Sequence, residues 1–261
     1  MCRVDGVLDI DGLSIEYRKI PGTKAGPTIV LLHEGLGCVS AWKDFPESLC
    51  DITGLSVFSY SRVGYGGSSP IELPKSVNFH SEEALIALPQ ILVAAAIGPC
   101  ILIGHSDGAS IATIYTGATK TSHQVKGLVL LAPHVLAENK CIVAVRRAVD
   151  SFDNGNLRSA LFKLHGSNTE CAFKGWSGVW TDPSFKSWNI EKYLPLISIP
   201  VLAIRGDDDP YNTPIHVERI VERVSGKVES FNLSNCAHAP HREQEGQILK
   251  LLSDFIFKIK K

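Results

Sequence analysis

The chain has 261 residues, 44% of them hydrophobic and 20% charged, and its 26 Lys and Arg against 27 Asp and Glu give a formal net charge of −1. This balance argues against a nucleic-acid-binding protein, which usually carries a basic face, and no apolar stretch approaches the roughly 18 residues of a membrane span. The seven cysteines are scattered, without a C-x-x-C pair, which is typical of reduced thiols and not of a zinc site. The first residues also lack the apolar run of a secretory signal, so we expect a soluble, cytoplasmic protein.

Six short apolar runs, each ending at a turn, predict the strands of a parallel sheet. In chain order they cover residues 28–32, 55–60, 100–103, 127–131, 200–204 and 228–233. Runs that are apolar on both faces are typical of strands buried between two layers of helices.

Amphipathic segments between these runs predict the covering helices. We expect Ser81 to cap one helix, which Pro89 kinks and Gly98 ends. We expect Thr213 to cap another, and the apolar stripe in 248–256 predicts a last helix. The alternation of strand and helix predicts a doubly wound α/β fold.

Residues 134–188 interrupt this alternation. No strand pattern is evident there, whereas the leucines at 157, 161 and 164 follow helical spacing, and three of the four tryptophans fall in this region. The sequence therefore predicts an α/β core formed by residues 1–133 and 189–261, with a helical insertion over 134–188.

A five-residue motif carries the chemistry. The sequence GHSDG at residues 104–108 follows a predicted strand and opens a predicted helix, and G-x-S-x-G in that context indicates a nucleophile elbow with Ser106 at its tip. A serine nucleophile needs a histidine base and an acid that orients the base. Downstream, three carboxylates at 207–209 follow a strand, and His238 lies in the loop before the last helix.

These motifs resemble those of the α/β-hydrolase superfamily, over residues 10 to 258 or so. The resemblance implies a mostly parallel eight-stranded sheet, with the insertion at 134–188 forming a cap over the active site. It implies a catalytic triad of Ser106, Asp209 and His238, because the family's acid follows a G-x-x-D pattern and its histidine precedes a sequence like Pro240-His241-Arg242-Glu243.

The resemblance also implies an oxyanion hole formed by two backbone amides. One is the amide of Asp107, and the other comes from the loop after the 28–32 strand, where the family's His-Gly-x is replaced by His33-Glu34-Gly35. We expect the Gly35 amide, with Leu36 as the alternative. Glu34 is either a structural carboxylate or a substrate contact. The candidates for the substrate pocket are Glu34, Leu36, His105, Trp176 and Trp180.

Taken together, the motifs predict a serine hydrolase that cleaves a small carboxylic ester, thioester or lactone through an acyl-enzyme, without a metal or organic cofactor. The expected partner is a small, largely apolar acyl compound, with no nucleic acid and no membrane, and the protein is expected to be a monomer or small homo-oligomer. Three alternatives share the fold: a carbon–carbon bond hydrolase of the meta-cleavage-product type, a hydroxynitrile lyase or cofactor-free peroxidase, and a ligand-binding receptor.

Overall fold

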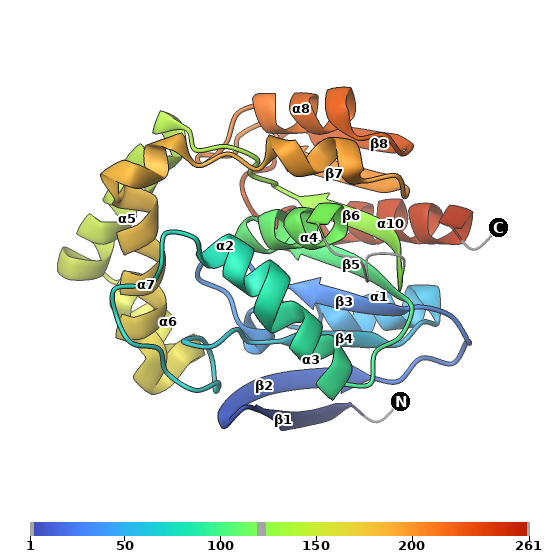
Figure 1. The fold of residues 1–261 in the computed structure, drawn as a ribbon, viewed down its shortest axis with the longest axis horizontal. Helices are drawn as coiled ribbons and strands as arrows, with labels where there is room; N and C mark the ends of the chain where they lie inside the picture. Colours follow the sequence, from blue (N-terminus) through green and yellow to red (C-terminus); the bar gives the residue numbers. More distant parts are fainter. Residues whose placement is uncertain (1–2, 119–123, 260–261) are drawn as a thin grey trace.

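A single eight-stranded sheet forms the centre of the computed structural model, which describes residues 3–118 and 124–259 (Figure 1). The strand order is β1-β2-β4-β3-β5-β6-β7-β8. β1 pairs antiparallel with β2 and β2 antiparallel with β4, whereas the other five pairs are parallel. The strands are β1 Val4–Ile10, β2 Leu13–Ile20, β3 Thr28–Leu32, β4 Val57–Tyr60, β5 Cys100–His105, β6 Val125–Leu131, β7 Val201–Gly206 and β8 Val228–Leu233. The predicted fold class is therefore confirmed.

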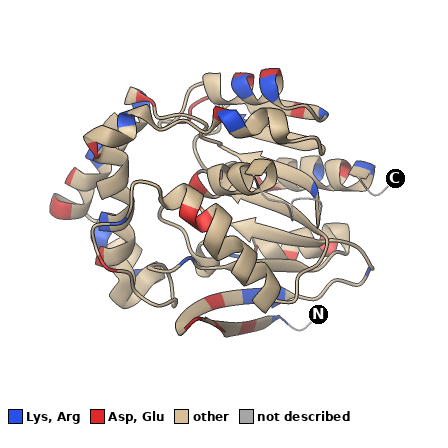
Figure 2. Ribbon diagram, in the orientation of Figure 1, with Lys and Arg blue, Asp and Glu red and all other residues tan. Residues whose placement is uncertain are grey.

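Helices cover both faces of this sheet. α3 (Leu88–Ala94), α4 (Asp107–Ala118) and α8 (Ile215–Arg223) pack on one face, and α1 (Phe45–Thr53) and α10 (Glu245–Ile259) on the other. Successive residues of a strand point to opposite faces, so in β3 Val30 and Leu32 join the first core and Ile29 and Leu31 the second. β3, β4 and β5 carry no Asp, Glu, Lys or Arg, and charges of both signs lie instead on the outer helices (Figure 2).

The predicted helix capped by Ser81 differs from the structure. The helical segment starts earlier, at α2 (Phe79–Glu82), continues as a π-helical stretch over Glu83–Ala87, and ends with α3 at Ala94 and not at Gly98. Ser81 thus lies inside the helix. The widened stretch comes directly before Pro89, which has no N–H to donate to the regular hydrogen-bond ladder.

The predicted cap at Thr213 is also wrong. α8 begins at Ile215 after Pro214, and the Thr213 side chain instead donates a hydrogen bond of 2.7 Å to Glu138 Oε1. Because Pro214 is the N-cap residue of α8, no side chain caps this helix.

Three helices follow β6 and form an apolar cluster of their own. They are α5 (Asn139–Asn154), α6 (Leu157–His165) and α7 (Thr169–Thr181), and they lie together beside one end of the sheet (Figure 1). Phe152 of α5 stacks on Phe173 of α7 with ring centroids 3.8 Å apart. A short helix, α9 (Pro240–Glu243), precedes α10. The three helices α5, α6 and α7 lie within residues 134–188, and the division of the chain into a core and an insertion stays a prediction.

Six of the seven cysteines lie in the described residues, all of them buried and none in a disulfide, while Cys2 lies outside the described part of the chain. Within residues 3–118 and 124–259, none of the helices combines the length and the apolar character that crossing a bilayer requires.

Glu138, which precedes α5, connects the inserted helices to α8 and should make stability depend on pH. Its carboxylate accepts hydrogen bonds from His216 Nε2 (2.6 Å) and from the N–H of Thr213 (3.0 Å). Burial alone raises the pKa of Glu138, but the bonds from His216 and Thr213 outweigh it and lower the pKa from 4.5 to about 2. A carboxyl with a depressed folded-state pKa contributes stability that is complete above its unfolded-state pKa and is lost as pH falls through the folded value.

We therefore expect Glu138→Gln to lower the free energy of unfolding at neutral pH by roughly 3 kcal/mol at most. The difference from the wild type should shrink as pH falls from 4.5 towards about 2. Urea unfolding at several pH values measures this difference. A gap between the two proteins that stays constant down to about pH 3 contradicts the assignment.

Candidate active site

Ser106 occupies a sharp turn between β5 and α4. Its φ angle of 53° lies in the left-handed region, which is strained for a residue with a side chain. Two glycines permit this turn by close backbone contact. A Cβ on Gly104 would lie 2.3 Å from the carbonyl oxygen of Gly108, and one on Gly108 would lie 2.1 Å from that of Leu32. The Ser106 N–H donates to Leu131 O at 2.9 Å, which fixes the turn against β6.

A chain of hydrogen bonds extends from the Ser106 hydroxyl. Ser106 Oγ lies 3.0 Å from His238 Nε2, and His238 Nδ1 lies 2.7 Å from Asp209 Oδ2. A proton on Nδ1 donates to the carboxylate and leaves Nε2 free to accept from the hydroxyl. The three residues come from three loops at the carboxyl ends of β5, β7 and β8, which is where sites of parallel α/β sheets form.

Asp209 lies fully buried behind the histidine. Its second oxygen, Oδ1, accepts from the N–H groups of Tyr211 (2.8 Å) and Asn212 (3.4 Å). Burial alone raises the pKa of Asp209, but the hydrogen bond and charge of His238 and the Tyr211 N–H lower it below its ordinary value. The carboxyl is therefore an anion at neutral pH, the form that orients and stabilises a histidine base.

The backbone amides expected for the oxyanion hole lie near Ser106. The N–H groups of Gly35, Leu36 and Asp107 have no acceptor among the described residues. A Cβ on Gly35 would lie 2.2 Å from Trp176 Nε1 and 3.0 Å from Asp107 Oδ2. Only glycine therefore fits between Trp176 of α7 and Asp107 at the start of α4. The backbone of Gly35 thus lies beside Asp107.

The Asp107 side chain connects the elbow to the inserted helices. Its Oδ1 accepts from His80 Nε2 at 3.1 Å and from Trp180 Nε1 of α7 at 3.2 Å. Burial raises its pKa, but the neighbouring His80 and Arg62 outweigh that effect and lower it to about 2. An ionised carboxylate thus lies beside the two amides.

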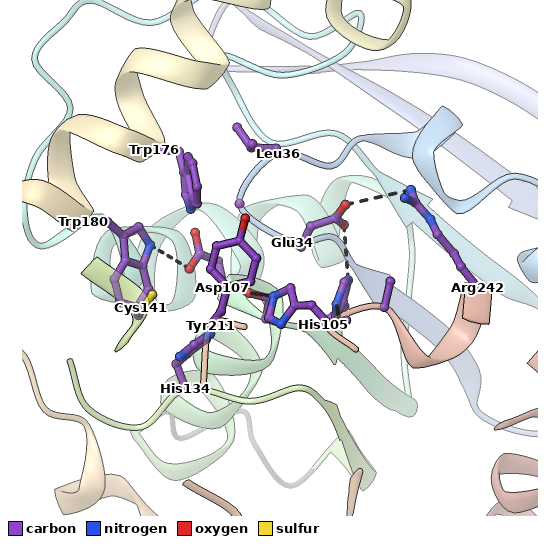
Figure 3. A pocket seen from close by; sticks show the side chains of 14 residues that line it. Glu34, Leu36, His105, Asp107, His134, Cys141, Trp176, Trp180, Tyr211 and Arg242 are labelled. Carbon is purple, nitrogen blue, oxygen red and sulfur yellow. Dashed lines mark hydrogen bonds and ion pairs between the residues drawn. The ribbon is translucent and has the colours of Figure 1, made fainter. Parts of the chain in front are cut away.

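A cavity with a volume of about 200 Å³ opens above Ser106. Trp176, Trp180 and Leu36 lie on one side of it, and Glu34 and Arg242 on the other (Figure 3). The structure thus brings together in one pocket every residue that the sequence nominated for the site, except Asp209, which lies behind His238. The lining residues are Glu34, Gly35, Leu36, His105, Ser106, Asp107, His134, Cys141, Trp176, Trp180, Tyr211, His238, Ala239 and Arg242.

Glu34 and His105 contact each other, and both line the pocket. Glu34 Oε2 lies 3.4 Å from His105 Nδ1, and Glu34 Oε1 lies 4.0 Å from Arg242. His105 Nε2 lies 2.6 Å from the carbonyl oxygen of His238, to which it donates. The hydrogen bond from His105 therefore stabilises the loop that carries His238. Glu34 lines the cavity, and its side chain is 19% exposed.

Five lining residues were absent from the sequence prediction: His134, Cys141, Tyr211, Ala239 and Arg242. Position alone could have indicated three of them, since Tyr211 and Ala239 lie next to predicted site residues and His134 follows the end of β6. Cys141, on α5, has no such signal. Among the described residues, no group of three or more His, Cys, Asp or Glu side chains is placed to hold a metal ion.

Known proteins resemble this chain in sequence and in fold. The model of an alpha/beta hydrolase family matches residues 29–250. A proline iminopeptidase from Mycobacterium smegmatis superposes with a TM-score of 0.75 at 15% identity, over 98% of each chain. An enol-lactonase from Burkholderia xenovorans superposes with a TM-score of 0.73 at 17% identity, over 97% of this chain and all (100%) of the other. A membrane phospholipase A has a TM-score of 0.76 at 18% identity, over 99% of this chain and 87% of the other.

At these identities the structural matches establish the fold, whereas the family model covers most of the chain. The chain belongs to the alpha/beta hydrolase family.

Proposed function

We propose that this protein is a serine hydrolase that cleaves a small carboxylic ester, thioester or lactone. The single observation that carries the proposal is the hydrogen-bonded chain from Ser106 through His238 to Asp209, at the floor of a cavity. The amides of Gly35 and Asp107, which have no acceptor among the described residues, add an electrostatic site for a carbonyl oxygen.

In the proposed mechanism, Ser106 Oγ attacks the acyl carbon while its proton passes to His238 Nε2. The electron pair of the carbonyl π bond moves to oxygen, and the amides of Gly35 and Asp107 donate to the resulting oxyanion. Asp209 stabilises the imidazolium. His238 then protonates the leaving group as the carbonyl reforms, and a water molecule repeats the cycle on the acyl-enzyme.

The shape of the cavity supports a small acyl compound as substrate. Its cap side is walled by the apolar side chains of Leu36, Trp176 and Trp180, with Tyr211 facing them (Figure 3). We propose that residues 134–188 act as the cap that selects the substrate, because α7 supplies both tryptophans. The cavity volume of about 200 Å³ lies below the roughly 300–1,000 Å³ usual for ligand pockets, which favours a small substrate.

A fluorophosphonate probe tests the proposal. We expect one probe molecule to attach per chain, on the peptide that contains Ser106, and hydrolysis of p-nitrophenyl esters of short acyl chains to stop in step with labelling. Peptide mass spectrometry locates the label. Attachment elsewhere, or an unlabelled protein, contradicts the proposal. A panel that adds thioesters, lactones and a vinylogous 1,5-diketone separates acyl-oxygen from carbon–carbon cleavage.

A further inference from the structure

Arg62 follows β4 and is buried without an ion pair to any described Asp or Glu side chain. Its side chain is 1% exposed, and within residues 3–118 and 124–259 no Asp or Glu side chain forms an ion pair with it. Burying a charge without an ion pair is costly, so the hydrogen bonds of this guanidinium need an explanation. Nη1 donates to the carbonyl oxygen of His33 at 2.6 Å, and Nη2 donates to that of Glu34 at 2.8 Å.

The second of these bonds reaches the peptide group that contains the Gly35 amide. A peptide group joins the carbonyl of one residue to the N–H of the next, so the Glu34 oxygen and the Gly35 N–H are its two ends. The Glu34 oxygen also lies 2.7 Å from His33 Nδ1. Because His33 Nε2 accepts the backbone N–H of Arg62 at 3.1 Å, the ring proton of His33 resides on Nδ1, which donates.

Two donors, one of them a cation, therefore hold the oxygen end of this peptide. Their hydrogen bonds fix its plane, and they polarise it in the direction that strengthens the N–H at the other end as a donor. Burial lowers the pKa of His33 well below its ordinary value, as does Arg62, so His33 is neutral and Arg62 supplies the charge.

The positive charge of Arg62 matters because the Asp107 carboxylate lies beside the two amides of the proposed oxyanion hole. An ionised carboxylate beside the two amides opposes a developing oxyanion by like-charge repulsion, more strongly in a buried site than in water. Arg62 is a buried cation whose charge acts on Asp107, and its guanidinium is bonded to the neighbouring loop. The positive charge of Arg62 thus compensates the negative charge of the Asp107 carboxylate beside the proposed oxyanion hole.

We propose that Arg62 is a positioning residue for the oxyanion hole, holding the Glu34–Gly35 peptide so that the Gly35 N–H points at the oxyanion formed when Ser106 attacks. The inference rests on the proposed function. It assigns a role to Arg62 that the sequence analysis did not indicate, and it selects Gly35 over Leu36 as the donor.

The test compares Arg62→Lys and Arg62→Met with Arg18→Met. Arg18 is a matched control, since it is also a buried arginine (7% exposed, against 1% for Arg62) but is bonded to Asp5 at the β1–β2 edge. Removing one oxyanion donor lowers turnover by about 10²–10³. We expect kcat to fall by about that factor in Arg62→Met and by roughly tenfold in Arg62→Lys, with KM unchanged in both and with Arg18→Met at the wild-type rate.

Two further measurements separate positioning from general damage. A trifluoromethyl ketone forms a tetrahedral oxyanion with a serine, whereas the matched methyl ketone binds in its ground state. The Arg62 variants should lose affinity for the first by the same factor as kcat and keep affinity for the second. Carbonyl-¹³C Glu with ¹⁵N Gly labelling reports the peptide directly, because the chain contains Glu-Gly only at 34–35 and 245–246.

We expect the 34–35 signal to shift in the Arg62 variants while the 245–246 signal, at the start of α10, stays in place and shows that the protein is folded. A shifted 34–35 signal with unchanged trifluoromethyl ketone affinity overturns the inference and leaves Arg62 a structural role. Equal loss of both ketones overturns it too. A wild-type protein that binds no trifluoromethyl ketone and hydrolyses no ester instead contradicts the proposed function itself.

Discussion

Ser106→Ala should lower kcat/KM for a p-nitrophenyl ester by roughly 10⁴ to 10⁶-fold, because loss of the nucleophile removes the acyl-enzyme route. What remains comes from the oxyanion amides and from binding. Alanine adopts the left-handed φ of 53° at the same penalty as serine, so the free energy of unfolding should change little. Steady-state kinetics and thermal unfolding of the two proteins measure both quantities.

Ser59→Ala is the matched control for this experiment. Ser59 lies on β4, is fully buried, and its Oγ has no hydrogen-bond partner among the described residues. We expect this variant to hydrolyse esters and to react with a fluorophosphonate at the wild-type rate. If Ser106→Ala retained more than about a hundredth of the activity, Ser106 could not be the nucleophile.

Asp209→Asn should lower kcat by about 10⁴-fold with little change in KM. The side-chain amide can turn its NH₂ towards His238 Nδ1, which favours the tautomer with the proton on Nε2. In that tautomer Nε2 no longer accepts the Ser106 proton, even though the geometry of 2.7 and 3.0 Å is kept. Burst kinetics with a p-nitrophenyl ester would place the loss in the acylation step.

The neighbouring carboxylates are controls within the same loop. Asp208 is exposed and Asp207 pairs with Arg205 at 3.2 Å, and neither contacts His238. We expect Asp208→Asn and Asp207→Asn to keep near wild-type kcat. A loss in either that equals the loss in Asp209→Asn would contradict the choice of Asp209 as the acid.

The parts of the fold that were predictable are those encoded over short stretches. Strands β3 to β7 follow from runs that are apolar on both faces, because only a strand between two helix layers buries such a run. β8 differs from the expectation of a strand buried on both faces, since it lies at the edge of the sheet and only Leu233 of its six residues is buried. The turn at Ser106 follows from Gly104 and Gly108, since backbone contacts at 2.3 and 2.1 Å exclude any other residue. These signals are local and need no knowledge of partners.

The parts that were missed depend on contacts between distant residues. The β1–β2 hairpin forms an edge with exposed Val4, Val7 and Leu13, so it lacks the apolar run that marks the other strands. The bond from Trp180 to Asp107 joins residues that are 73 positions apart. The far wall of the pocket, with Cys141 on α5, likewise depends on how three helices pack, which spacing alone does not fix.

Asp107 connects two parts of the molecule, the turn at Ser106 and the inserted helices. Its amide lies beside Ser106, and its carboxylate accepts the indole N–H of Trp180 from α7. Replacing α5–α7 with a different helical insertion, in order to engineer a new substrate preference, therefore takes a donor away from a buried anion next to the reacting atoms. Among the described side chains His80 would then be the one remaining donor to this carboxylate, and a buried charge that loses a hydrogen bond is costly. A transplanted insertion must bring its own indole, or another N–H, to that oxygen, so in this protein selectivity and turnover have to be redesigned together.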